Sequence, residues 1–266
     1  MARGGDGSTL TRVRAVSRAV AVLRAFSPHQ PTLTLSEVAR AAGLDAGTAR
    51  RILVTLADEG LIRQDADTSR YQLTHDMLEL AASVSPGHSL REIVQDDLVH
   101  LARSTETTAF LSVLQNDQAV CVARHHGIAA IEVKWWSIGG NMPLHCGAGP
   151  RVLLAHMPLP KQTRVLGGEL AALTPKGITS PAALRRELAK VRRQGWALAV
   201  DDVAEGLAAA AAPIKTRKGE TIGAVSVAGL SPHITAKAKP RHLDELMHCV
   251  QAIARKLNDY PVPPTD

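Results

Sequence analysis

The chain is poor in cysteine and in aromatic residues, and it has no long apolar segment. Its three cysteines, Cys121, Cys146 and Cys249, are few and odd in number, which argues against a disulfide framework and predicts a reducing, cytoplasmic location. No run of about 18 uncharged apolar residues is present, so we expect neither a membrane span nor a membrane partner. The start of the chain also lacks the apolar stretch of a secretion signal. Aromatic residues make up only 3%, so the cores must consist mainly of Ala, Val, Leu and Ile.

Lysine is absent from the first 51 residues, although the whole chain has a net charge of +6. This segment holds eight arginines against three acidic residues, Asp6, Glu37 and Asp45, which gives it a net charge of +5. A basic segment is compatible with nucleic-acid binding, although charge alone equally fits a solvated surface. With 266 residues, the chain is long enough for two modest domains with separate cores.

Three helices are predicted before residue 60. Apolar residues recur every three or four positions over residues 13–25, as on one face of a helix. Thr34 and Glu37 form a capping-box pattern that starts a second helix, and Gly43 ends this helix after residue 42. Asp45 caps a third helix that runs to residue 59. Two helices joined by a short turn with a glycine are typical of a helix-turn-helix.

A hairpin is predicted directly after the third helix. Residues 61–63 and 71–73 have the pattern of two strands, and residues 65–69 join them, with Arg63 and Arg70 near the tip. A hairpin of this kind is the wing of a winged helix-turn-helix. The complete order of helix, capped helix, glycine turn, helix and arginine-flanked hairpin is much more specific for DNA binding than any one of its parts.

The sequence of residues 33–53, LTLSEVARAAGLDAGTARRIL, resembles the IclR family of bacterial transcriptional regulators, and DEGLI (58–62) and RYQL (70–73) continue the match. The resemblance implies that the second helix of the motif enters the major groove. Carried over by position, the residues that face the groove are Ala46, Gly47, Thr48, Arg50 and Arg51. The family often has Lys or Arg at the place of Ala46 and Ser at the place of Gly47.

The chemistry of these side chains assigns them different roles on double-stranded DNA. Arginine bonds guanine at two points, so Arg50 is the expected base reader. Arg51, Thr48 and Ser36 are expected to hold phosphate, together with the amides at the helix starts. Arg63 and Arg70 on the wing are expected to reach phosphate or the minor groove.

A domain boundary is expected at the Ser-Pro-Gly segment of residues 85–87. We therefore expect a winged helix-turn-helix domain over residues 12–74, a linker with a short helix over 75–88, and an effector-binding domain over 89–260. In this last domain, strands are predicted at residues 109–114, 119–123, 131–136, 197–200, 207–214 and 221–227, and helices from residue 90 and at 149–156, 181–193 and 241–257. Strands interrupted by helices and partly joined by hairpins indicate an α+β fold.

The resemblance to IclR regulators extends through residues 142–155, 193–197, 206–214 and 222–229. It implies a GAF-like effector domain with a pocket for a small molecule. The residues that it places in this pocket are Ile131, Lys134, Met142, Cys146, Ala148, Gly149, Asp201, Leu207, Ala209 and Ser226.

The chain departs from the family pattern at three places in this region. Pro150-Arg151 replaces the usual Gly-Lys, and proline is tolerated in the first turn of a helix. Ala208-Ala209 replaces the usual Arg-Cys and removes a polar pocket position. The acidic run before residue 203 begins two residues late, which leaves only Asp201 and Asp202.

An organic acid is the expected effector, with aromatic acids among the candidates. The amides of Ala148 and Gly149 precede a helix and suit a carboxylate, and Lys134 adds a charge-assisted bond. On a regular strand, Trp136 and Lys134 share one face, so a ring can stack on Trp136. The competing interpretation is that Trp136 packs into the core or into a subunit contact.

Two other classes of protein fit individual residues. His125, His126, His145 and Cys146 include metal-ligand types, as in a metal-responsive regulator, but no preset ligand spacing is present. His145 and Cys146 suggest a thiol enzyme, but no third orienting group is evident.

We therefore expect a regulator and not an enzyme, without a cofactor. A single module of this size makes few base contacts, so the protein is expected to bind a partly palindromic operator as a homodimer, or as a homotetramer by resemblance to the family. Repression and activation both remain open, because both occur among IclR-like regulators.

Overall fold

The computed structural model describes residues 13–27, 30–82, 90–127, 136–237 and 239–259. The chain divides into two units, Met1–Pro86 and Gly87–Asp266, each of which has its own core. No helix in the described part is both long and apolar enough to span a bilayer.

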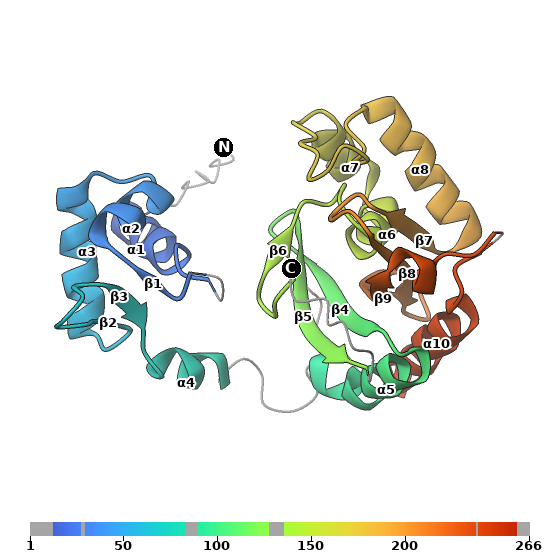
Figure 1. Ribbon diagram of the computed structural model, residues 1–266, viewed down its shortest axis with the longest axis horizontal. Coiled ribbons are helices and arrows are strands. Elements are labelled where there is room, and N and C mark those ends of the chain that lie inside the picture. Colours follow the sequence, from blue (N-terminus) through green and yellow to red (C-terminus); the bar gives the residue numbers. More distant parts are fainter. Residues whose placement is uncertain (1–12, 28–29, 83–89, 128–135, 238, 260–266) are drawn as a thin grey trace, which may run out of the picture. The chain divides into compact units, whose positions relative to one another are not determined.

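The first unit is a winged helix-turn-helix (Figure 1). Its elements are α1 (Arg14–Leu23), β1 (Thr32–Leu33), α2 (Leu35–Ala42), α3 (Ala46–Asp58), β2 (Ile62–Gln64) and β3 (Tyr71–Leu73), followed by α4 (Asp76–Ala82). The three strands form an antiparallel sheet in the order β1-β3-β2. The sequence predicted the β2–β3 hairpin, but not β1, because a two-residue strand leaves no periodic pattern.

The caps of the helix-turn-helix are those that the sequence predicts. The Thr34 hydroxyl accepts a hydrogen bond from the Glu37 amide (3.3 Å), and the Glu37 carboxylate accepts one from the Thr34 amide (2.7 Å). Gly43 ends α2 in the left-handed conformation, with φ 63°. The Asp45 carboxylate then caps α3 by accepting from the Thr48 amide (2.8 Å). These bonds fix the turn between the two helices of the motif.

The apolar face of α1 points away from the core of its own unit. Val13, Val16 and Val20 are 63%, 60% and 37% exposed, whereas Val22, which lies outside this stripe, is fully buried. Ala19 and Leu23 of α1 pack against this core, whose other buried members come from the segment after α1, from α2, α3 and the sheet, namely Phe26, Leu33, Val38, Leu53, Leu56, Ile62 and Tyr71. The amphipathic pattern therefore predicted the helix correctly, but its valines do not stabilise this unit.

The second unit contains a six-stranded antiparallel sheet in the order β6-β5-β4-β9-β8-β7. Its strands are β4 (Thr108–Gln115), β5 (Gln118–His126), β6 (Asn141–Met142), β7 (Ala197–Val200), β8 (Leu207–Lys215) and β9 (Thr221–Leu230). Its helices are α5 (Leu90–Thr105), α6 (Ala148–His156), α7 (Leu159–Leu166), α8 (Pro181–Gln194), α9 (Ser231–Ile234) and α10 (Leu243–Asp259). This architecture confirms the α+β expectation.

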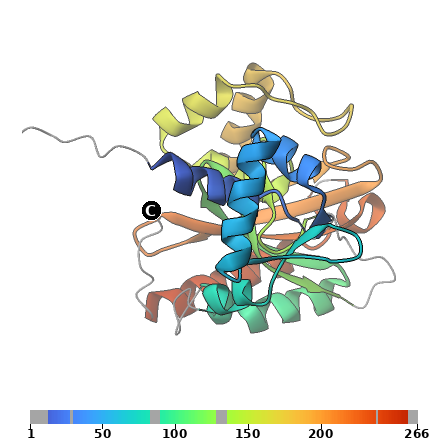
Figure 2. The same ribbon diagram turned by 90° about the vertical axis from the view of Figure 1, so that its left-hand side faces the viewer.

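Helices cover both faces of this sheet. The pair α5 and α10 lies on one face, and α6, α7 and α8 lie on the other, as Figures 1 and 2 both show. Side chains between α5, α10 and the sheet form one core, and side chains around α6 and α8 form a second core. This two-sided cover agrees with the GAF-like arrangement expected from the resemblance.

Some elements of the second unit differ from the prediction. The sequence pattern did not indicate β6, α7 and α9, all of which are short. Of the strand predicted at 131–136, residues 131–135 lie outside the described part, and Trp136 lies in a bend. Because Trp136 is not in a strand, its position does not support the expectation that Trp136 and Lys134 share one face of a strand.

Candidate DNA-binding and effector-binding sites

The N-terminal half of α3 presents an exposed surface. Ala46, Gly47, Arg50 and Arg51 are exposed, and Thr48 is half-buried, whereas Ala49 between them is buried in the core. The bond from the Thr48 amide to the Asp45 carboxylate lowers the pKa of Asp45. Ser36, in the first turn of α2, is also exposed. The structure thus places the candidate groove and phosphate residues of both helices on solvent-facing positions.

The two arginines of α3 differ in their surroundings. The Arg51 guanidinium donates to the Thr48 hydroxyl one turn earlier (3.3 Å). Within the described part of the chain, Arg50 has neither a hydrogen bond nor an ion pair. All donors of Arg50 are therefore available to a ligand, which is the state that a base-reading arginine needs.

The two arginines of the wing also differ. Arg63 on β2 is exposed, and its guanidinium lies beside the amide group of Gln72, its partner across the hairpin. The loop between the strands is closed by Asp65, whose carboxylate accepts from the amide and hydroxyl of Thr68 (2.8 and 2.7 Å). Arg63 therefore projects from an ordered hairpin.

Arg70, in contrast, is engaged inside its own unit. Its Nε donates to the Thr32 hydroxyl (3.2 Å), and one terminal nitrogen donates to the Thr32 carbonyl (3.1 Å) and to the Glu37 carboxylate (3.0 Å). Because Glu37 also closes the capping box of α2, Arg70 connects the wing to β1 and to the start of the helix-turn-helix. No local sequence pattern indicates this connection, because 33 residues separate Arg70 from Glu37.

The second unit contains a cavity between the start of α6 and the sheet. The room for the centre of a water-sized molecule is about 30 Å³, and the space around it that no atom fills is about 430 Å³, which includes open solvent. A row of cross-strand partners, Ala199, Ala209 and Ala228, forms part of the floor on β7, β8 and β9. Phe110 and Ser226 are also paired across β4 and β9 and line the same space. Small side chains at the alanine positions leave the room that the cavity occupies.

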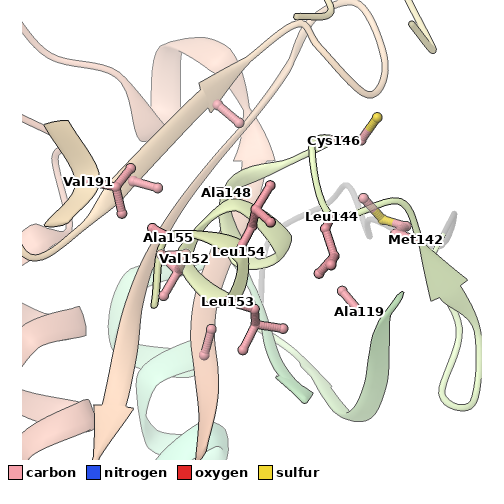
Figure 3. Packing of buried hydrophobic residues seen from close by; sticks show 14 of the residues in the cluster. Ala119, Met142, Leu144, Cys146, Ala148, Val152, Leu153, Leu154, Ala155 and Val191 are labelled. Carbon is pink, nitrogen blue, oxygen red and sulfur yellow. The ribbon is translucent and has the colours of Figure 1, made fainter. Parts of the chain in front are cut away.

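Most of the predicted effector residues that the structure describes line this cavity. They are Trp136, Met142, Ala148, Gly149, Leu207, Ala209 and Ser226. Ile131 and Lys134 lie outside the described residues. Cys146 and Asp201 do not line the cavity. Figure 3 shows the Cys146 sulfur pointing away from Met142 and Leu144, and this sulfur lies 3.9 Å from the Ala171 carbonyl.

Asp201 is a turn residue. It adopts a positive φ of 57°, and its carboxylate accepts from the Gly206 amide (2.8 Å) and the Ser231 hydroxyl (3.3 Å). The bond from Gly206 is the main cause of a lowered pKa for Asp201. The next residue, Asp202, points the other way and lines the cavity, so the one-residue difference decides which carboxylate a ligand can meet.

A buried ion pair joins Asp202 to Arg151 of α6, with side chains 6% and 5% exposed. The same Asp202 oxygen, Oδ2, accepts from the Gly147 amide (3.0 Å), while Arg151 Nε donates to the His145 carbonyl (3.0 Å). The sequence pattern did not indicate this pair, although Arg151 is a departure from the family pattern and Asp202 remains from its shortened acidic run.

Two aromatic rings form one wall of the cavity. The rings of Phe110 and Trp136 stack with centroids 5.8 Å apart and an interplanar angle of 27°. Trp136 is held in place by a hydrogen bond from Nε1 to the Gly140 carbonyl (3.0 Å) and is 4% exposed. Trp136 is therefore both a core residue and a cavity residue, so the two interpretations offered by its sequence do not exclude each other.

The surroundings of Cys146 do not fit a nucleophilic thiol. Burial, with the nearby charge of Asp202, raises the pKa of Cys146 to about 11, so that this sulfur carries a proton at neutral pH. His145 Nε2 donates to the Ala171 carbonyl (2.9 Å). Among the described residues, no group of three or more His, Cys, Asp or Glu side chains is arranged to hold a metal ion.

Comparison with known proteins agrees with the two units of the fold. The IclR helix-turn-helix domain matches residues 15–66, and the family described as bacterial transcriptional regulator IclR C-terminal matches residues 82–255. The glycerol operon regulatory protein of Streptomyces griseus is 33% identical over 250 residues, which cover 92% of this chain and 96% of that protein.

Solved structures with the same fold include an IclR homolog from Microbacterium hydrocarbonoxydans complexed with 4-hydroxybenzoate (24% identity, TM-score 0.79) and an IclR transcriptional regulator from Alicyclobacillus acidocaldarius (24% identity, TM-score 0.81). Each match covers 92% of this chain and 99% of the other. Since the matched effector family alone spans more than half of the chain, the protein belongs to the IclR family of DNA-binding transcriptional regulators with a C-terminal ligand-binding domain.

Proposed function

We propose that this regulator reads an operator with α3, assembles through α1 and changes its affinity for DNA when an organic acid binds in the cavity of the second unit. The observation that carries the proposal is the pairing, in one chain, of an unengaged base-reading arginine at α3 with a cavity lined by paired aromatic rings.

Arg50 is proposed to read a base and Arg51 to hold phosphate. Among the described residues, none contacts the donors of Arg50, whereas Arg51 is already oriented by Thr48. The variant Arg50→Ala should lower discrimination between an operator and single-base variants by about 1–3 kcal/mol. The variant Arg51→Ala should weaken binding to every sequence alike and lower the salt dependence by about one unit.

Fluorescence anisotropy with an operator selected from random DNA measures both effects in one salt titration. Each arginine variant serves as the control for the other, since both remove one exposed charge from the same helix. The division of roles is wrong if the two variants lose the same amount on operator and on mismatched DNA.

The exposed valines of α1 are proposed as an assembly surface. Val13, Val16 and Val20 lie on one side of this helix and do not contribute to the core of their unit, which is an unusual position for three β-branched apolar side chains. A two-fold dimer doubles the number of base contacts that one helix-turn-helix can make. Membership of the family supports a homodimer or homotetramer on a partly palindromic operator.

The proposed effector is a small organic acid, with aromatic acids preferred. The Ala148 and Gly149 amides at the start of α6 suit a carboxylate, and the stacked rings of Phe110 and Trp136 suit a planar ligand. The neighbour from Microbacterium hydrocarbonoxydans was solved with 4-hydroxybenzoate, which makes this acid a rational first probe.

Calorimetry with 4-hydroxybenzoate and its neutral counterpart 4-hydroxybenzamide tests the carboxylate. The two molecules have nearly the same shape, so that only the charge changes. Tighter binding of the acid is expected, since a charge-assisted bond to an amide is stronger than a neutral one. Equal affinity for the two molecules would contradict an acid effector.

A further inference from the structure

We propose that Asp202 and Ser226 form a subsite for a hydrogen-bond donor, so that the effector carries a hydroxyl or amino group besides its carboxylate. This inference rests on the proposed function, because it concerns the same cavity. The inference adds to the proposed function a second polar group of the effector and the two side chains that recognise this group.

Asp202 has one oxygen that is fully engaged and one that is not. Oδ2 accepts from both the Gly147 amide and the Arg151 guanidinium. Within the described residues, no hydrogen bond reaches Oδ1, although Asp202 is only 5% exposed and lines the cavity. Oδ1 is not among the fully enclosed unpaired atoms of the described residues, so it keeps contact with solvent in the cavity, where a donor on a bound ligand can take the place of water.

Ser226, like Asp202, has a cavity-lining oxygen without a hydrogen-bond partner among the described residues. Its residue is 3% exposed and lines the cavity, and among the described residues its hydroxyl makes no hydrogen bond. Ser112 shows the contrast, because its buried hydroxyl donates to the Ala224 carbonyl (3.3 Å). Both serines lie beside Gly149, where an added Cβ would stand 3.1 Å from the Ser112 hydroxyl and 3.7 Å from that of Ser226. The lack of a side chain at Gly149 keeps the approach to Ser226 open.

The charges at this end of the cavity favour a donor over a second acceptor. Asp202 already supplies a negative charge to the start of α6, and Arg151 compensates this charge. A ligand atom that only accepts hydrogen bonds could accept from the Ser226 hydroxyl, but it would be repelled by Oδ1. A hydroxyl or amino group donates to Oδ1, and a hydroxyl also accepts from Ser226.

Matched benzoates test the subsite without altering the protein. Hydroxy-, amino- and fluorobenzoates, each with the substituent at ring positions 2, 3 and 4, have similar size, but fluorine donates no hydrogen bond. At the preferred ring position, calorimetry should give the hydroxy and amino compounds an affinity about 10-fold or more above that of the fluoro compound, as expected for a bond to a charged group. Equal affinities of the three substituents at every position, or no binding of any donor compound, would overturn the inference.

Two variants connect the preference to the residues. In Asp202→Asn, the amide oxygen must face Gly147 and Arg151, both of which are donors, so the amide NH2 takes the place of Oδ1. The amino compound should then lose its advantage over the fluoro compound, while the hydroxy compound keeps part of it because a hydroxyl also accepts. Ser226→Ala removes only one atom from the lining and should reduce the advantage of the hydroxy compound. Unchanged preferences in both variants would overturn the assignment.

Failure of this inference is distinguishable from failure of the proposed function. If the carboxamide of the preferred donor compound binds as tightly as its acid, the organic-acid proposal fails and the donor subsite stands. If fluoro and hydroxy acids bind equally and both bind more tightly than their carboxamides, the acid proposal stands and the donor subsite fails.

Discussion

Loss of Asp202 should destabilise the second unit strongly. In Asp202→Ala, the Arg151 guanidinium would stay 5% exposed without its carboxylate, and the Gly147 amide would lose its acceptor. Removal of one partner of a buried ion pair costs about 3–5 kcal/mol, and a domain of this kind has roughly 5–15 kcal/mol in total. Solvent screening does not reduce this cost, because both side chains are buried.

Two further variants isolate the origin of the loss. In Arg151→Met/Asp202→Ala, no unpaired charge remains, so this double variant should be more stable than Asp202→Ala alone. Arg164→Ala removes an ion pair to Asp117 whose side chains are 72% and 41% exposed, and it should cost less than about 0.5 kcal/mol.

Urea unfolding followed by tryptophan fluorescence reports on the second unit alone. All three tryptophans of the chain, Trp135, Trp136 and Trp196, follow residue 87, so the first unit is silent in this assay. The expected order of stability is wild type and Arg164→Ala, then the double variant, then Asp202→Ala. An Asp202→Ala protein that is as stable as Arg164→Ala would refute the structural role of the pair.

Three other predictions concern the first unit and the thiols. Arg70→Met should lower the stability of the first unit by about 1 kcal/mol and leave the salt dependence of DNA binding unchanged, because Arg70 is engaged by Thr32 and Glu37. If the slope of the logarithm of DNA affinity against the logarithm of salt concentration becomes smaller by about one, Arg70 holds phosphate instead. Val16→Glu should shift the particle mass seen by light scattering towards the monomer, and an unchanged mass would exclude α1 from the assembly surface. Burial raises the pKa of Cys146 to about 11 and of Cys121 and Cys249 to about 12. Iodoacetamide at pH 8 should therefore alkylate the native protein at least about 100-fold more slowly than the urea-unfolded chain. Equal rates would contradict the burial of these thiols.

Local sequence signals predicted the elements that local interactions determine. The capping box of Thr34 and Glu37, the left-handed Gly43 and the cap at Asp45 each depend on residues within four positions, and all three agree with the structure. Strand β7 was predicted with its observed bounds, because its residues form a continuous apolar run between a glycine and an acidic turn.

Contacts between distant residues were not predictable in this way. Arg70 was expected on the surface of the wing, since nothing near it in the sequence indicates that Thr32 and Glu37 engage its donors. Asp201 and Asp202 are adjacent, but Asp201 has a positive φ and lies in a turn, whereas Asp202 lines the cavity and contacts Gly147 and Arg151. The sequence therefore placed most of the residues that line the cavity, but it did not single out Asp202, and the role of this cavity as the effector site stays a prediction.

The central claim is that one effector controls binding to DNA, and reciprocal linkage tests it most directly. Calorimetry measures the affinity of the best organic acid for the free protein and for its complex with the selected operator, and anisotropy measures the affinity for the operator with and without saturating acid. If the cavity controls α3, the acid binds the two forms with different affinities, and the ratio equals the factor by which the acid changes operator affinity. An acid that binds the free protein and the DNA complex equally tightly would contradict effector control.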